Sequence, residues 1–217
     1  MAFYGEVRRQ YGPTLYSQFY EESLIRHFFR DRREGFFVDV GASHYQIHSN
    51  TYFLESKLGW HGIAVDALDE YRIDYERFRR NTRFFAAFVS NRAGEMADFT
   101  VSLADKRTST GIEALLPELV ADAGLTHLRI PTVTLNGLLD GQGVKKVDLL
   151  SLDIEGAEPL ALEGFDIERF RPDLVCVEIR ELTEGSINRY FARHGYVEVD
   201  RYRLLDGSNR YFAPPGF

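Results

Sequence analysis

The sequence has few of the features that define several common protein classes. Its one cysteine, Cys176, excludes an internal disulfide bond and a cysteine-based metal cluster. No apolar run approaches the roughly 18 residues of a membrane-spanning helix. Charges also interrupt every apolar run in the first thirty residues, so we expect a cytoplasmic protein with no membrane contact. Basic residues are outnumbered, 26 against 33 acidic ones, which argues against a general nucleic-acid-binding protein because such binding depends on neutralising phosphates.

The chain does contain enough apolar material for a sizeable core. Apolar residues make up 44% of its 217 residues, and aromatic residues make up 14%. A single core can serve a chain of this size, since cores grow to roughly 250 residues before they split. We therefore expect one domain over residues 1–217, with residues 1–15 as an N-terminal extension.

Five short apolar runs are spaced along the chain, at residues 36–40, 62–66, 84–89, 147–153 and 174–178. Each is nearly continuous rather than alternating, which is typical of strands buried on both faces of a parallel sheet. Most of the segments between them have helix signals, as in βαβ units.

Capping residues mark the expected helices. Beginnings are expected at Ser17, at Ser49 or Asn50, at Asp69 and at Ser186, and two ends at Gly59 and Gly195. A solvated face is expected for the arginines that follow Asp69, namely Arg72, Arg77, Arg79, Arg80 and Arg83.

Two segments depart from the strand–helix rhythm. Residues 91–134 are rich in Thr, Gly and Asp, and we expect a hairpin at about 95–103 followed by a surface excursion over the site. Residues 196–200 alternate between apolar and polar, and residues 210–212 return after a turn at 206–208. The sequence therefore predicts an α/β fold, a mostly parallel sheet flanked by helices with a C-terminal antiparallel β-hairpin at one edge.

Acidic residues stand at the ends of several predicted strands. Asp66, Asp153 and Glu178 end their runs, and Asp39 precedes Gly41 by two residues. Ligands of open α/β sheets bind at the carboxyl ends of the strands, and a buried carboxylate needs a partner or water. Four acids at one edge therefore indicate a site for hydroxyl groups or a cation.

The turn after the first strand excludes one common ligand class. A dinucleotide-binding turn needs G-x-G-x-x-G, and here only Gly41 is present, with Ser43 and Gln46 at the later positions. S-adenosylmethionine fits better, because it has an ammonium, a sulfonium, a carboxylate and a ribose diol but no phosphate. Asp66, 25 residues beyond Gly41, stands where an acid would accept the ribose hydroxyls. The helix start near Asn50 can offer N–H groups to the carboxylate.

Together these motifs resemble the FkbM family of methyltransferases. The matching segments are Tyr16-Ser17-Gln18, residues 37–42 (FVDVGA), 49–51 (SNT), 58–62 (LGWHG) and 151–158 (SLDIEGAE), spread over residues 16–196. The resemblance implies a class I, Rossmann-like seven-stranded sheet and S-adenosylmethionine-dependent O-methylation, often of a sugar or secondary metabolite. Two departures stand out: Ala67 after Asp66, where relatives commonly have Glu-Pro, and the loop 44–48.

The resemblance also implies roles for individual residues. The expected cofactor-binding residues are Gln18, Asp39, Gly41, Ala42, Ser43, Asn50, Thr51, Asp66, Ala87 and Phe88. Residues 39–43 would hold the methionine end, and Ala87 and Phe88 would line the adenine pocket. Helix capping by Asn50 and Thr51, and core packing by Ala87 and Phe88, are the structural alternatives.

Asp153 and His44 are the candidate catalytic residues. Asp153 would act as a general base, orient the acceptor, or join Glu178 in holding Mg²⁺, although no spacing requires a metal. His44 directly follows the cofactor turn and is a second candidate base. The acceptor is expected to be a small molecule or a sugar. A nicotinamide-dependent oxidoreductase and a non-catalytic binding module are the alternatives, and the sequence leaves the oligomeric state open.

Overall fold

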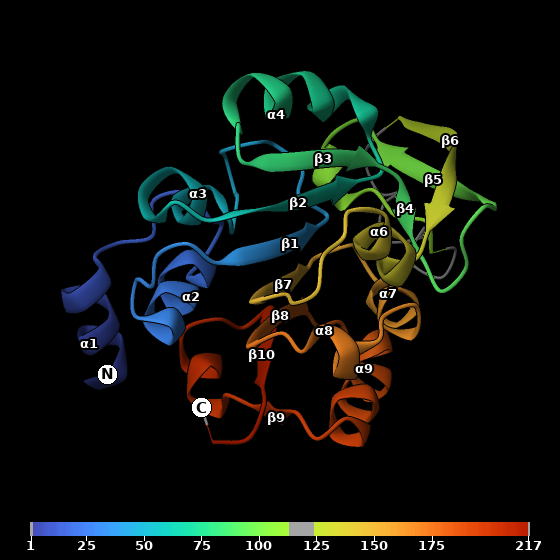
Figure 1. Cartoon of the computed structure of the whole chain (residues 1–217). Coiled ribbons are helices and arrows are strands. Elements are labelled where there is room, and N and C mark those ends of the chain that lie inside the picture. Colours follow the sequence, from blue (N-terminus) through green and yellow to red (C-terminus); the bar gives the residue numbers. More distant parts are fainter. Residues whose placement is uncertain (1, 113–123, 217) are drawn as a thin grey trace.

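The computed structural model describes residues 2–112 and 124–216, and its centre is a seven-stranded sheet in the order β3-β2-β1-β7-β8-β10-β9 (Figure 1). The strands are β1 (Phe36–Val40), β2 (His61–Asp66), β3 (Thr82–Ala86), β7 (Leu149–Leu152), β8 (Leu174–Glu178), β9 (Val197–Glu198) and β10 (Asn209–Ala213). Neighbours pair in parallel except at β10, which is antiparallel to both β8 and β9. The expected seven-stranded, mostly parallel α/β fold is confirmed.

Helices cover both faces of this sheet. One face carries α2 (Glu21–Phe29), α3 (Tyr52–Leu58) and α4 (Arg72–Phe78), and the other carries α6 (Leu135–Gly141), α7 (Glu158–Glu163), α8 (Ile167–Phe170) and α9 (Glu181–Arg193). Successive strand residues point to opposite faces, so Phe37 packs with the first group and Val38 with the second. This two-sided burial explains the continuous apolar runs. Among the described residues, none of the helices has the length and apolarity of a membrane span.

A second, three-stranded sheet corrects two expectations. It has the order β4-β6-β5, with β4 (Phe88–Val89), β5 (Met96–Ser102) and β6 (Leu125–Val133). The apolar run 84–89 is therefore two strands, β3 in the main sheet and β4, which pairs with β6. The hairpin expected at about 95–103 is wrong: β5 is one continuous strand without a glycine or proline to form a turn, and β6 is its antiparallel partner. Residues 113–123 of the expected excursion lie outside the described residues.

The two ends of the chain also differ in part from expectation. The N-terminal extension contains a helix, α1 (Ala2–Tyr11), which buries Val7 and Tyr11. Strands β9 and β10 form the expected antiparallel pair, but a 3-10 helix, η4 (Asp200–Leu204), separates them in sequence. Strand β10 lies between β8 and β9, so the short β9 forms the sheet edge.

Two helix-level expectations also need correction. Helix α9 begins at Glu181 rather than at Ser186, because Thr183 Oγ1 accepts the Arg180 N–H at 3.2 Å and closes the first turn there. Arg79, expected on a solvated face, is only 1% exposed and pairs with the buried carboxylate of Glu55. Arg79 directly follows α4, and its guanidinium turns inward to contact the Tyr45 carbonyl and Thr51.

Candidate active site

A pocket lies where the carboxyl ends of β1, β2 and β7 meet the second sheet. It encloses about 810 Å³ of space, part of it open to solvent. Seven residues expected from the sequence line it: Gln18, Gly41, Ser43, Asp66, Ala87, Phe88 and Asp153. The structure therefore brings residues from five separate segments to the sheet edge where the acids were expected.

Gly41 shapes the inner wall of this pocket. Its φ of +82° is unfavourable for any residue with a side chain, and a Cβ placed on it would lie 1.7 Å from the backbone oxygen of Asp153. The turn after β1 thus packs directly on the end of β7. The space beside the Gly41 Cα is filled by the backbone of Asp153, which leaves no room for a side chain at this position.

Asp66 ends β2 and is held by two backbone N–H groups. Ser43 donates to its Oδ2 and Leu68 donates to its Oδ1, each at 2.9 Å. Burial raises the pKa of Asp66 to about 6, although the two N–H groups act in the opposite direction. Asp66 is therefore fixed in orientation, is mostly charged at neutral pH and becomes mostly neutral below about pH 6.

Four residues expected at the cofactor lie outside the pocket lining: Asp39, Ala42, Asn50 and Thr51. Asp39 is buried and accepts a 2.7 Å hydrogen bond from Thr51 Oγ1. Asn50 Nδ2 donates to Ser151 Oγ at 3.1 Å, and the carbonyl of Ala42 accepts the Tyr75 hydroxyl at 3.1 Å. These contacts hold the turn after β1 in place from outside the pocket lining.

The start of α3 and the candidate base His44 also form hydrogen bonds within the protein. Ser49 Oγ accepts the N–H groups of Thr51 and Tyr52 at 3.3 and 3.1 Å. His44 is not among the lining residues, and its Nδ1 accepts the N–H groups of Gln46 and Ile47 at 3.1 and 3.0 Å. A role for His44 as a base stays a prediction that this geometry does not favour.

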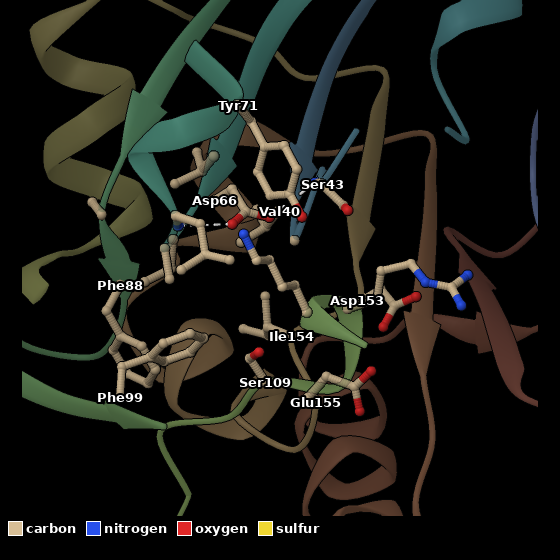
Figure 2. A pocket seen from close by; sticks show the side chains of 18 of the residues that line it. Val40, Ser43, Asp66, Tyr71, Phe88, Phe99, Ser109, Asp153, Ile154 and Glu155 are labelled. Carbon is tan, nitrogen blue, oxygen red and sulfur yellow. Dashed lines mark hydrogen bonds between the residues drawn. The ribbon is translucent and has the colours of Figure 1, made fainter. Parts of the chain in front are cut away.

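One side of the pocket is apolar and aromatic. Figure 2 shows the side chains of Phe88 and Phe99 on the side away from Asp153, with Tyr71 above Asp66. The two phenyl rings are 6.2 Å apart, centre to centre, in an edge-to-face arrangement. No motif in the sequence indicated Phe99 or Tyr71. Phe99 lies in β5, where a hairpin was expected, and Tyr71 ends the 3-10 helix η1 (Asp69–Tyr71).

The other side is acidic. One carboxylate oxygen from each of Asp153, Glu155 and Glu178 lies within 4.8 Å of the others, and Asp153 and Glu155 line the pocket (Figure 2). Burial first, and then repulsion by Glu178 and Glu155, raises the pKa of Asp153 well above its ordinary value. The same causes, burial and then Glu178, raise the pKa of Glu155 to about 8.

Basic side chains reach the pocket from the 3-10 helix η2 (Lys106–Thr108). Lys106 and Arg107 both line it, and Lys106 Nζ contacts both carboxylate oxygens of Glu70 at 2.7 Å. Arg107 contacts Asp105 and Nδ1 of His48. This rim belongs to the 91–134 segment, and no motif in the sequence indicated it.

The chain matches a known protein family over most of its length. The model of the Methyltransferase FkbM domain matches residues 39–198, most of the chain. The chain belongs to the FkbM methyltransferase family. The resemblance drawn from the motifs is confirmed, and the cofactor of this FkbM protein is S-adenosylmethionine. The nicotinamide-dependent alternative finds no support.

Solved structures similar to this FkbM protein are distant methyltransferases. They include precorrin-6Y C5,15-methyltransferase from Geobacter metallireducens (11% identity, TM-score 0.46, covering 88% of this chain and 84% of that one). A TehB-like methyltransferase from Corynebacterium glutamicum has 12% identity and a TM-score of 0.46, covering 98% of this chain and 93% of that one. 1,6-Didemethyltoxoflavin-N1-methyltransferase from Burkholderia thailandensis has 13% identity and a TM-score of 0.44, covering 89% and 74%. No curated protein matches the sequence.

Proposed function

We propose that this FkbM protein transfers a methyl group from S-adenosylmethionine to a hydroxyl group of a small molecule, such as a sugar or a secondary metabolite. The observation that carries the proposal is the position of Asp153. It lies at the end of β7 on the acidic side of the pocket, and among the described residues its carboxylate has no hydrogen-bond or ion-pair partner. A free carboxylate there is available to an acceptor.

The pocket has the chemistry that the cofactor requires. The apolar side, with Phe88 and Phe99, suits the adenine ring, and Asp66 at the end of β2 suits the ribose hydroxyls. The acidic side suits the positive charges of the sulfonium and the ammonium. When bound, S-adenosylmethionine supplies an electrophilic methyl group. The tight contact of Gly41 with the Asp153 backbone brings the turn and the acidic side of the pocket together.

Asp153 would act as the base for the acceptor hydroxyl. Methyl transfer depends mainly on positioning, and a base is needed when the acceptor is a hydroxyl group. Its raised pKa makes Asp153 a stronger base than an ordinary aspartate. Mg²⁺ is not part of this proposal, because Arg180 already supplies positive charge to two of the three clustered carboxylates.

The cofactor side is tested first, by calorimetric titration with S-adenosylhomocysteine. The wild-type protein should bind it, and Asp66→Asn should weaken binding at least about tenfold, since a charged acceptor of two hydroxyl groups is lost. Asp69→Asn, three residues later on the exposed surface, should bind like the wild type. Absence of binding by the wild-type protein would refute the proposal.

The transfer step is tested with labelled S-adenosylmethionine and a panel of hydroxylated acceptors. Asp153→Asn should lower kcat by about 100-fold or more, the usual contribution of a general base, and weaken S-adenosylhomocysteine binding much less than Asp66→Asn does. If the wild-type protein binds the cofactor and methylates no acceptor, the non-catalytic module is the better description. Full activity of Asp153→Asn would remove Asp153 from the mechanism.

A further inference from the structure

Three elements meet at the acidic side of the pocket. Glu155 lies in the loop after β7, Glu178 is the last residue of β8, and Arg180 immediately precedes α9. Glu155 has a φ of +54°, an uncommon conformation for a residue with a side chain. The backbone thus places two acids and an arginine together beside Asp153.

Arg180 binds both glutamates. Its Nε and Nη2 donate to Oε2 and Oε1 of Glu178, each at 3.1 Å, a two-pronged contact that fixes the carboxylate in orientation. Nη2 also contacts Oε2 of Glu155. The backbone of Arg180 is fixed as well, because its N–H group donates to Thr183 Oγ1 and its carbonyl accepts the Thr183 N–H at 3.0 Å.

We propose that Arg180 is a positioning residue at the acceptor end of the pocket: it holds Glu155 and Glu178 in place and leaves Asp153 as the one carboxylate of the three presented to the acceptor. The division follows from the contacts, since Arg180 binds two of the three acids and Asp153 has no partner among the described residues. The inference deepens the proposed function and rests on it, because the proposed function is what places an acceptor beside Asp153.

Arg180 also bears on the protonation of the acids around Asp153. The acids that raise its pKa come from β8 (Glu178), the loop after β7 (Glu155), α7 (Glu158) and α2 (Glu21). Arg180 lies at the start of α9 and lowers the pKa of Glu155, and Arg107 and His48 lie in the same pocket lining. Without the charge of Arg180, the carboxylates would hold protons to higher pH, and Asp153 would be less available to accept one.

The test follows the carboxyl carbons by NMR in a pH titration of the protein labelled with ¹³C at Asp and Glu. The Asp153 signal is assigned by its loss in Asp153→Asn. Arg180→Gln should raise the Asp153 midpoint by about one pH unit or more, and Arg180→Lys, which keeps the charge, should raise it less. Arg189→Gln, on the exposed face of the same helix, should leave it unchanged.

Calorimetry with S-adenosylhomocysteine separates this proposal from the proposed function. Arg180→Gln should bind it within about twofold of the wild type, because Arg180 serves the acceptor end. An unmoved midpoint in folded Arg180→Gln, or a loss of cofactor affinity as large as that of Asp66→Asn, would overturn the proposal. If the wild type fails to bind the cofactor, the proposed function fails while the titration still decides whether Arg180 controls Asp153.

If Arg180→Gln does not fold, Glu155→Gln tests the same proposal. Removing one negative charge beside Asp153 should lower its midpoint, the opposite sign to Arg180→Gln. A purely structural role of the cluster would not produce shifts of opposite sign. A midpoint that Glu155→Gln leaves unchanged counts against the proposal in the same way.

Discussion

Thr51 Oγ1 donates a 2.7 Å hydrogen bond to Oδ2 of Asp39, and both residues are buried. In the structure these residues belong to a polar network next to the turn after β1, and the cofactor role suggested by the sequence stays a prediction. Arg79 extends this network, with Nη2 donating to Thr51 Oγ1 at 3.1 Å and Nε contacting Glu55. Burial raises the pKa of Asp39, and its hydrogen bond to Thr51 and the charge of Arg79 offset this effect.

Arg79→Met should strongly destabilise the protein. It would leave the buried carboxylate of Glu55 without its cation, which costs about 3–5 kcal/mol in comparable buried pairs. The exposed neighbouring Arg80→Met is the control and should change the free energy of unfolding by less than about 0.5 kcal/mol. Urea unfolding measures both. Equal effects of the two changes would show that the buried pair is not what holds this region.

Gly41→Ala tests the close approach of the β1 turn to β7. Gly41 and Gly94 share a φ of +82°, but only at Gly41 does a Cβ meet the backbone of Asp153; at Gly94 nothing lies within 4 Å. Gly94→Ala should therefore cost only the left-handed conformation, about 1–2 kcal/mol. Gly41→Ala should add an overpacking cost of about 1–3 kcal/mol or more. Thermal unfolding compares the two, and equal losses would contradict the predicted clash.

The parts of the site that could be predicted from the sequence are those set by a single strand end. Gly41, Asp66 and Asp153 each follow a continuous apolar run, and parallel strands bring their carboxyl ends to one edge. Such residues need no knowledge of distant pairing. The same reasoning placed Asp39 at the ligand. In the structure Asp39 accepts a hydrogen bond from Thr51 and lies outside the pocket lining, so its role at the cofactor stays a prediction.

The parts that could not be predicted depend on pairing between distant segments. Phe99 reaches the pocket only because β5 pairs with β6, and their paired residues are separated by up to 35 positions, as between Met96 and Pro131. Arg180 joins Glu155 and Glu178 across two strands and a helix start. Buried Arg79 is equally hard to recognise, since it stands in a stretch of exposed arginines and only the fold turns it inward.

Binding of S-adenosylhomocysteine should strengthen as the pH rises through about 6. The pKa of Asp66 is raised by burial to about 6, so at pH 5 most molecules carry a neutral carboxyl that accepts hydroxyl donors less well. From that pKa the ionised fraction gives about tenfold tighter binding at pH 8 than at pH 5. Calorimetry at the two pH values measures it. Two variants are the controls. The affinity of Asp66→Asn should change less between the two pH values, and the affinity of Asp69→Asn should change as in the wild type.

Glu158→Gln should become more stabilising, or less destabilising, as the pH rises. Glu158 is fully buried, and its Oε1 accepts the N–H groups of Ile154 and Gly156, contacts that glutamine can keep. Burial first, and then Glu178, raises its pKa to about 7 from an unfolded value near 4.5. Between these values the folded protein binds more protons than the unfolded chain, so the free energy of unfolding falls as pH rises.

Glutamine cannot titrate, so the change removes this contribution to the pH dependence. The difference in the free energy of unfolding between Glu158→Gln and the wild type should therefore grow in favour of the variant by about 1–3 kcal/mol from pH 4.5 to pH 8. Urea unfolding across this range measures it. Glu163→Gln, at the exposed end of the same helix, should run parallel to the wild type. A constant difference for Glu158→Gln would mean that Glu158 is charged in the folded protein throughout the range.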